Sequence, residues 1–135
     1  MLKQKLKFKR IMLIDDNTID LYITARLMAK CNFAEHINQY NSAQKALEFL
    51  RENQNNCNVL PQIIFLDIYM PQMSGFEFMI EYDKLSLDLK KYCKVYILSS
   101  SIDEDDIKTA NDDINVVAFQ VKTITAQFLD SIPFY

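Results

Sequence analysis

Short apolar runs alternate along this chain with longer segments in which apolar residues recur every three or four positions. The short runs predict strands at residues 10–15, 35–40, 62–67, 94–99 and 116–121. The longer segments predict helices at residues 18–31, 42–54, 74–88, from 101 onward and at 124–132. This alternation predicts an α/β fold, because right-handed crossovers turn it into a parallel sheet with helices on both faces.

The second predicted strand indicates the order of the sheet. Residues 35–40 alternate between apolar and polar side chains, which is typical of a strand at the edge of a sheet. Five strands with a polar second strand favour the order 2-1-3-4-5, a doubly wound, flavodoxin-like (βα)5 three-layer sandwich. At 135 residues, with no linker, repeat or low-complexity segment, residues 1–135 are expected to form a single domain.

Several predicted helices begin at side chains that can accept bonds from free backbone N–H groups. These caps are Asn17 for the first helix, Ser74 with Glu77 for the third, and Ser101 with Glu104 for the fourth. On the first helix, helical spacing places four apolar residues on one face, namely Ile19, Tyr22, Ile23 and Leu27.

Three carboxylates follow the first and third predicted strands. Asp15 and Asp16 come directly after Ile14, and Asp67 comes directly after Leu66. Because neighbouring parallel strands end at the same edge of the sheet, we expect these acids to meet in one pocket. Their repulsion and lost hydration are costly without a cation. Each acid alone is equally typical of a turn or a helix cap, so only the combination favours a site.

Magnesium is the cation that this pattern favours, since it prefers oxygen ligands, octahedral geometry and several retained waters. Asp16 and Asp67 are candidate direct ligands, and Asp15 is a candidate ligand that binds directly or through water. The backbone carbonyl of Tyr69, two residues beyond Asp67, is a further candidate.

A hydroxyl and an ammonium are expected near the same edge. Ser99 ends the fourth strand, and Lys122 lies near the end of the fifth. Both can bind anionic oxygens, so the acids, magnesium, Ser99 and Lys122 together describe a phosphoryl-transfer site. Taken alone, Lys122 also fits a surface lysine whose apolar stem packs along the strand.

The sole glycine of the chain, Gly75, lies eight residues after Asp67 at the start of a predicted helix. A loop that must bend tightly beside the acids explains its position. An ordinary turn glycine is compatible with the same position.

Composition narrows the class of protein. With 15 basic and 18 acidic residues, the net charge of −3 argues against nucleic acid as a partner. Five basic residues gather near the start, either as a solvated lead-in or as a basic docking arm: Lys3, Lys5, Lys7, Lys9 and Arg10. No run approaches the length of a membrane span, and no signal peptide is evident.

The cysteines and the single histidine indicate no metal centre of their own. Cys31, Cys57 and Cys93 are odd in number, widely spaced and outside any CxxC pair, which favours reduced thiols in the cytoplasm. His36 has no cysteine or histidine at ligand spacing, so a zinc site is not expected.

An ordered set of short motifs resembles the receiver domain of bacterial two-component response regulators. The motifs are Ile14-Asp15-Asp16-Asn17, Leu66-Asp67-Ile68-Tyr69-Met70-Pro71 with Gly75, Ile97-Leu98-Ser99-Ser100, and Phe119-Gln120-Val121-Lys122. The resemblance extends from about residue 9 to residue 132. It implies a protein to which a sensor histidine kinase or a phosphotransfer protein donates a phosphoryl group.

The resemblance implies a role for each matching residue. Asp67 is the expected phosphoacceptor, and Asp15 and Asp16 are the acidic pair that holds magnesium. Ser99 matches the hydroxyl residue that turns to contact the phosphoryl group, Lys122 matches the lysine that pairs with it, and Phe119 matches an aromatic residue that changes rotamer. Phosphorylation adds about two negative charges, so the fourth helix and fifth strand are expected to repack and switch a downstream target protein.

Two flanking features refine this expectation. Tyr69 and Ser101 match positions beside the attacking water, so we expect Tyr69 to slow hydrolysis of the aspartyl phosphate. The acidic run Asp103-Glu104-Asp105-Asp106 fits either a favourable interaction with the helix dipole or a patch that faces a partner.

One residue departs from the family pattern. Thr123 follows Lys122, where the family usually has a proline after a cis bond. A cis bond before threonine costs about 3–4 kcal/mol. We therefore expect either a trans bond with an altered loop or a cis exception.

A different function is compatible with part of the pattern. Magnesium-dependent phosphohydrolases of the haloacid dehalogenase type also use an aspartyl nucleophile on such a sheet, but they carry an Asp-x-Asp motif and usually a cap domain. Asp67-Ile68-Tyr69 lacks the second acid, and 135 residues leave no room for a cap. A metal-independent scaffold leaves the acids unexplained. The sequence thus favours a stand-alone signalling module that is not an enzyme beyond its own phosphoryl uptake and slow loss.

Overall fold

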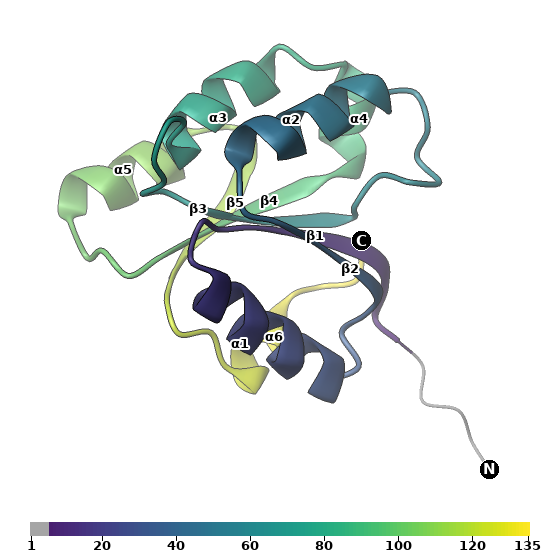
Figure 1. The fold of residues 1–135 in the computed structure, drawn as a ribbon, viewed down its shortest axis with the longest axis vertical. Helices are drawn as coiled ribbons and strands as arrows, with labels where there is room; N and C mark the ends of the chain where they lie inside the picture. Colours follow the sequence, from purple (N-terminus) through teal and green to yellow (C-terminus); the bar gives the residue numbers. More distant parts are fainter. Residues whose placement is uncertain (1–5) are drawn as a thin grey trace.

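The computed structural model describes residues 6–135, which form a parallel five-stranded sheet between two layers of helices (Figure 1). The strands are β1 (Phe8–Ile14), β2 (Ala34–Tyr40), β3 (Ile63–Asp67), β4 (Lys94–Ser99) and β5 (Val116–Val121). The helices are α1 (Thr18–Lys30), α2 (Ala43–Glu52), α3 (Gly75–Asp83), α4 (Leu87–Tyr92), α5 (Glu104–Asp112) and α6 (Ala126–Ser131). The strands pair in the order β2-β1-β3-β4-β5, so the predicted doubly wound order is confirmed.

Alternate residues of the central strands enter two separate cores. Ile11 and Leu13 of β1 pack with apolar residues of α1 and α6, whereas Met12 and Ile14 pack with those of α2, α3 and α4. Figure 1 shows α1 and α6 on one face of the sheet and the other helices on the opposite face. Because both faces are covered, the buried parts of these strands, residues 11–14 of β1 and 63–66 of β3, are continuous apolar runs.

The register of the strands brings distant residues to one edge. Ile14 of β1 pairs with Leu66 of β3, so Asp15 emerges beside Asp67. Along the same edge β3 pairs with β4, and β4 in turn pairs with β5 up to Ser99. The carboxyl ends of β1, β3, β4 and β5 therefore surround one region, as the strand order predicts.

The buried face of α1 differs from the face that its spacing indicated. Ile19, Tyr22 and Ile23 are 68%, 59% and 48% exposed, whereas Leu21 and Met28 are buried against the sheet. Apolar residues occur around most of this helix, so their spacing did not determine which side packs. The result is an exposed apolar strip on the first two turns of α1.

The third predicted helix, 74–88, is two helices. α3 ends at Asp83, and α4 begins at Leu87 after Ser86, whose side chain accepts a hydrogen bond from the backbone N–H of Leu89. Ser86 thus caps a new helix where the pattern indicated a continuous one. As a result, the predicted fourth helix corresponds to α5 and the predicted last helix to α6.

The caps of the other helices are mostly as expected. Asn17 accepts bonds from the N–H groups of residues 19 and 20, and Ser74 and Glu77 form the predicted capping box. For α5 the prediction was wrong, because its cap is Asp103 and not Ser101. The Asp103 carboxylate accepts from two backbone N–H groups at once, while Ser101 accepts a bond from the backbone N–H of Asp103.

The basic lead-in is partly tied to the fold. Lys3 and Lys5 lie outside the described residues, but the Lys7 ammonium donates to the carbonyls of Leu129 and Asp130 at the end of α6. None of the helices within residues 6–135 has the length and apolar content needed to cross a membrane.

Candidate functional site

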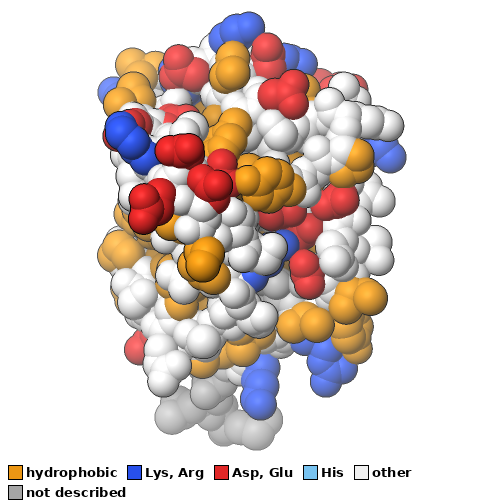
Figure 2. All heavy atoms as spheres, turned by 90° about the vertical axis from the view of Figure 1, so that its left-hand side faces the viewer, with side chains coloured by type: hydrophobic (Ala, Val, Ile, Leu, Met, Phe, Trp, Pro, Cys, Tyr) orange, Lys and Arg blue, Asp and Glu red, His pale blue; other side chains and the backbone are white. Residues whose placement is uncertain are grey.

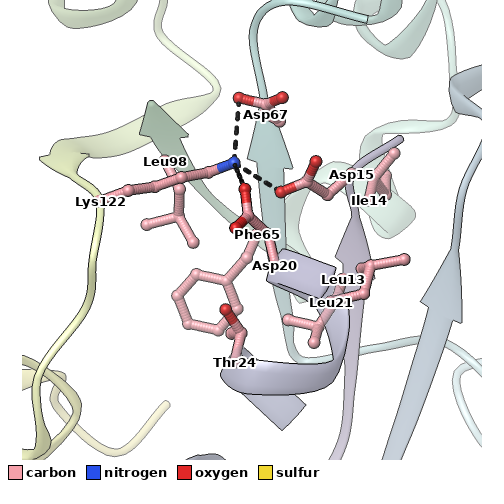
Figure 3. Close-up of a pocket in the computed structure, with 10 residues that line it drawn as sticks. All are labelled: Leu13, Ile14, Asp15, Asp20, Leu21, Thr24, Phe65, Asp67, Leu98 and Lys122. Atoms are coloured by element: carbon pink, nitrogen blue, oxygen red, sulfur yellow. Dashed lines mark hydrogen bonds and ion pairs between the residues drawn. The ribbon is translucent and has the colours of Figure 1, made fainter. Parts of the chain in front are cut away.

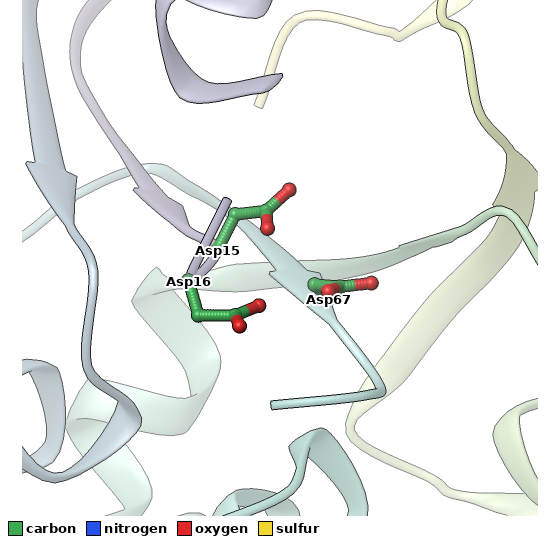
Figure 4. Close-up of side chains that lie close together, drawn as sticks. All are labelled: Asp15, Asp16 and Asp67. Atoms are coloured by element: carbon green, nitrogen blue, oxygen red, sulfur yellow. The ribbon is translucent and has the colours of Figure 1, made fainter. Parts of the chain in front are cut away.

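Three carboxylates gather at the carboxyl edge of the sheet. Asp15 and Asp16 follow β1, Asp67 ends β3, and Figure 4 shows their side chains converging. One oxygen of each lies within 4.8 Å of the others. Figure 2, which views this side of the molecule, shows acidic side chains close to a small basic group. The two strand ends therefore build the pocket that the sequence predicts.

The surroundings of the three acids differ. Asp15 and Asp67 are each 8% exposed, whereas Asp16 is exposed. Asp15 accepts a hydrogen bond of 2.9 Å from the backbone N–H of Asn17. No hydrogen bond or ion pair within residues 6–135 occupies the Asp16 carboxylate. A free carboxylate beside two buried ones is an all-oxygen donor set that suits a hard divalent cation such as Mg²⁺.

Lys122 places its ammonium among these carboxylates (Figure 3). Its Nζ lies 2.6 Å from Oδ2 of Asp15 and 3.6 Å from Oδ1 of Asp67. A third carboxylate, that of Asp20 on α1, lies 3.1 Å away. The Lys122 side chain is 17% exposed, so these ion pairs are screened less than pairs at an open surface.

Burial and neighbouring charges shift the pKa values of both Asp67 and Lys122. Burial raises the pKa of Asp67 to about 6; the nearby Lys122 lowers it, while Asp15 and Asp16 raise it further. Burial acts to lower the pKa of Lys122, but the bonds and charges of Asp15, Asp67 and Asp20 outweigh it, so that pKa is raised. Lys122 therefore remains a cation, and Asp67 becomes fully ionised when further positive charge is added nearby.

Asp20 is the member of this group that the sequence reasoning missed. It lies in the first turn of α1, where an acid is already explained by its favourable interaction with the helix dipole. Its place in the first turn of α1 keeps it near the end of β1, but no local pattern links it to Lys122.

Ser99 and Phe119 occupy the two strands beyond Asp67. Ser99 is fully buried, and its hydroxyl accepts a hydrogen bond of 3.0 Å from the backbone N–H of Ser101. Its backbone carbonyl accepts from the N–H of Lys122. Phe119 is partly buried and packs against a small cluster that includes Ile97 of β4 and Ala110 of α5. The loop after Ser99 leads directly into α5, so a change at Ser99 can be transmitted to that helix.

Tyr69 connects the pocket to α5. Its side chain is 57% exposed, and its hydroxyl donates a hydrogen bond to the carboxylate of Asp106. Ser101 donates a second bond of 3.3 Å to the same carboxylate oxygen. The acceptor carboxylate raises the pKa of Tyr69. Asp106, in the acidic run that starts α5, therefore binds two residues that flank the pocket.

The reason for the sole glycine is a close approach and not a positive φ. Gly75 donates a backbone hydrogen bond of 2.7 Å to the carbonyl of Ile68. A Cβ at this position would overlap the carbonyl oxygen of Asp67 and lie 2.9 Å from the Cα of Ile68. No other residue fits where α3 begins against the end of β3.

The peptide bond between Lys122 and Thr123 is cis. Of the two outcomes expected where threonine replaces the usual proline, this is the second.

Comparison with known families agrees with this geometry. Residues 11–132 match the sequence model of the response regulator receiver domain. The chain therefore belongs to the response regulator receiver domain family, the class of domain that takes part in phosphorelay signalling. The acidic pocket of Asp15, Asp16 and Asp67 fits the Mg²⁺ and phosphoacceptor site of this class.

Individual relatives are found in plants and bacteria. The chain is 38% identical over 80 residues to the two-component response regulator ARR12 of Arabidopsis thaliana, an alignment of 59% of this chain and 12% of that protein. A two-component response regulator from Cytophaga hutchinsonii has a similar structure, with a TM-score of 0.83, 28% identity and coverage of 90% of this chain and 91% of that chain. A receiver protein from Dyadobacter fermentans follows, with a TM-score of 0.79, 26% identity and coverage of 90% and 91%.

Proposed function

We propose that this chain is a phosphoacceptor in a phosphorelay and that Asp67 receives the phosphoryl group. The observation that carries this proposal is the convergence of two buried carboxylates, one unpaired carboxylate and one ammonium at a single strand edge. Asp15, Asp16, Asp67 and the backbone carbonyl of Tyr69 would hold Mg²⁺. The ion, when bound, supplies positive charge that ionises Asp67 and neutralises the phosphoryl oxygens.

The proposed chemistry is a simple displacement. A carboxylate oxygen of Asp67 attacks the phosphorus of a phosphohistidine, forming an O–P bond as the N–P bond breaks, and the imidazole nitrogen keeps the bonding electron pair. Lys122 binds a developing phosphoryl charge, and the Ser99 hydroxyl donates to another phosphoryl oxygen. These are positioning and charge-stabilising roles, which suits a protein that accelerates its own phosphorylation without turning over a separate substrate.

The phosphoryl group would then act as a switch. The Ser99 hydroxyl accepts from the N–H of Ser101 and would donate its own hydrogen to a phosphoryl oxygen, and a rotation of the side chain toward that oxygen would pull on the loop between β4 and α5. That movement would repack Phe119 and alter the surface of α5 and β5. A downstream target protein that distinguishes the two surfaces would read the signal.

We propose a sensor histidine kinase or a histidine phosphotransfer protein as the donor. The exposed side chains of Ile19, Tyr22 and Ile23 follow the acidic pair along α1, so an apolar docking strip adjoins the pocket. No nucleic acid or membrane partner is proposed, in keeping with the net charge of −3. The cysteines are free thiols, which supports action of this receiver domain in the reducing cytoplasm.

The hydrolase alternative finds little support. Position 69, where the haloacid dehalogenase pattern needs a second acid, holds a tyrosine whose hydroxyl is bonded to Asp106. The family match favours a signalling domain.

Incubation with Mg²⁺ and either acetyl phosphate or a beryllofluoride mimic tests the proposal. The wild type should gain one acid-stable, base-labile phosphoryl group, or bind one mimic, and Asp67→Asn should do neither. Transfer from a phosphorylated histidine protein should follow the same pattern. Repeated turnover of simple phosphate esters would instead indicate a hydrolase.

A further inference from the structure

The ammonium of Lys122 is shared by three carboxylates, and the one on α1 has no assigned role. Asp15, Asp20 and Asp67 lie 2.6, 3.1 and 3.6 Å from Nζ. An ammonium has three N–H donors, and Figure 3 shows the three oxygens approaching it from different elements. A phosphoryl oxygen on Asp67 must therefore share or replace one of these contacts.

Asp20 differs from the other two partners. Asp15 and Asp67 belong to the cluster whose oxygens converge within 4.8 Å, and Asp20 does not. Its side chain is 37% exposed and comes from the first turn of a 13-residue helix. When Asp15 and Asp67 turn their oxygens to a metal or a phosphoryl group, Asp20 is the carboxylate still free to hold Lys122.

We propose that Asp20 is a positioning residue that anchors the Lys122 ammonium beside Asp67, ready to bind the transferred phosphoryl group. The inference rests on the proposed phosphoacceptor role of Asp67. One N–H of Lys122 stays with α1, and the remaining donors face the phosphoryl oxygens. α1 thereby fixes the position of an ammonium that belongs to Lys122, directly after the edge strand β5.

The flexibility of lysine explains the need for an anchor. Lys122 carries its charge on a four-carbon stem that loses considerable rotamer entropy when it is fixed. It also follows the edge strand β5, so only one neighbouring strand restrains its backbone. A carboxylate on a rigid helix holds the ammonium in place before the phosphoryl group binds, so less rotamer entropy is lost on binding.

Asp20 could instead compete with the phosphoryl group and hold Lys122 back. The two roles predict opposite results when the charge of Asp20 is removed. An anchor makes phosphoryl binding weaker on removal, whereas a competitor makes it tighter. The sign of the change therefore decides between them.

The test measures two affinities of the purified chain for wild type, Asp20→Asn and Asp20→Glu. The first is the affinity for Mg²⁺ alone, and the second is the affinity for beryllofluoride at saturating Mg²⁺, both by calorimetry. Asp20→Asn should bind beryllofluoride about tenfold more weakly, as expected for loss of a partly exposed charge-assisted bond, with Mg²⁺ affinity changed by no more than about threefold. Asp20→Glu should recover most of the loss.

Phosphorylation kinetics give an independent readout. With acetyl phosphate, Asp20→Asn should lower the rate at saturating donor and leave the half-saturating donor concentration nearly unchanged, because Lys122 acts mainly on the transferring group. Asp88→Asn is the matched control, since it removes one carboxylate from the first turn of α4. It should behave as wild type in both assays.

Each outcome decides the proposal. The anchoring role is overturned if Asp20→Asn binds beryllofluoride as tightly as the wild type or more tightly. It is also overturned if Asp20→Glu binds beryllofluoride no more tightly than Asp20→Asn. If Asp20→Asn proves unstable, Asp20→Ser, which keeps a polar first-turn residue, replaces it in the same comparison. Failure of the wild type to bind beryllofluoride would refute the phosphoacceptor function itself, which is a distinguishable result.

Discussion

Gly75 lies so close to the backbone of Asp67 that no side chain can stand between them. The start of α3 is pressed against the end of β3 at the residue that carries the proposed phosphoryl group. The hydrogen bond from the N–H of Gly75 to the carbonyl of Ile68 holds this contact. The conformation of the loop between β3 and α3 and the position of the Asp67 backbone therefore depend on each other.

Gly75→Ala should destabilise the protein by at least about 2 kcal/mol, because the added methyl meets backbone atoms that cannot move aside. Urea unfolding followed by circular dichroism measures this change. Thr18→Ala is the control, since Thr18 is exposed and also occupies the first position of a helix. An equal and small effect of both substitutions would show that the contact between Gly75 and Asp67 is not tight.

Asp67→Asn should raise the melting temperature without metal at pH 7.5 and have little effect near pH 4. Burial raises the pKa of Asp67 to about 6 from an ordinary value of 3.8. Well below pH 3.8 the carboxyl is protonated in both the folded and the unfolded state, whereas above pH 6 it is ionised in both and its buried charge destabilises the fold. The expected gain at pH 7.5 is about 2–5 °C.

Thermal scans at a series of pH values check this prediction, with exposed Asp88→Asn as the control. The gain of Asp67→Asn over wild type should shrink as the pH falls from 7 to 4. It should also shrink when Mg²⁺ is added, because the ion stabilises the ionised wild-type carboxylate. A gain that grew toward low pH would contradict the raised pKa.

Mg²⁺ should raise the melting temperature of the wild type and should leave the melting temperature of the Asp16→Asn variant nearly unchanged. Asp16 is exposed and has no protein partner among residues 6–135, so its replacement removes a proposed Mg²⁺ ligand without disturbing the core. Stabilisation should follow the free Mg²⁺ concentration and disappear with a chelator. Equal stabilisation of both proteins would place the ion elsewhere.

Tyr69→Ala should shorten the lifetime of the aspartyl phosphate by about threefold to tenfold. We expect the large side chain, two residues beyond Asp67, to screen the water that would attack the phosphorus, with its bond to Asp106 holding it in place. That size of change is about 0.7–1.4 kcal/mol of barrier. Loss of radiolabelled phosphate with time measures the lifetime.

Tyr69→Phe separates the two parts of this effect. It keeps the ring and removes the hydroxyl that Asp106 binds. A lifetime between those of wild type and Tyr69→Ala is expected. Slower loss of phosphate from Tyr69→Ala than from wild type would overturn the screening role.

The fold was predictable because the buried strands leave a strong signal. Ile63 to Leu66 are apolar on both faces and end in an acid, so strand, edge and candidate pocket follow from one short segment. The order of strands needed only the polar character of β2 and the rule for crossovers.

Errors arose where local chemistry outweighs periodicity. Ser86 divides a continuous helical pattern by capping α4, and Asp103 caps α5 in place of Ser101 because its carboxylate accepts two N–H bonds. Asp20 was missed because its position in a first helical turn already had an explanation. Its contact with Lys122 joins residues 102 positions apart, which no local pattern can show.

The most direct test of the central claim is to locate the phosphoryl group by chemical trapping. The protein is phosphorylated with acetyl phosphate and Mg²⁺, the acyl phosphate is reduced with borohydride, and the modified residue is identified by peptide mass spectrometry. We predict a single reduced residue, at position 67, that is absent when Mg²⁺ is removed. Reduction at Asp15 or Asp16, or no reduction in a folded protein, would contradict the account.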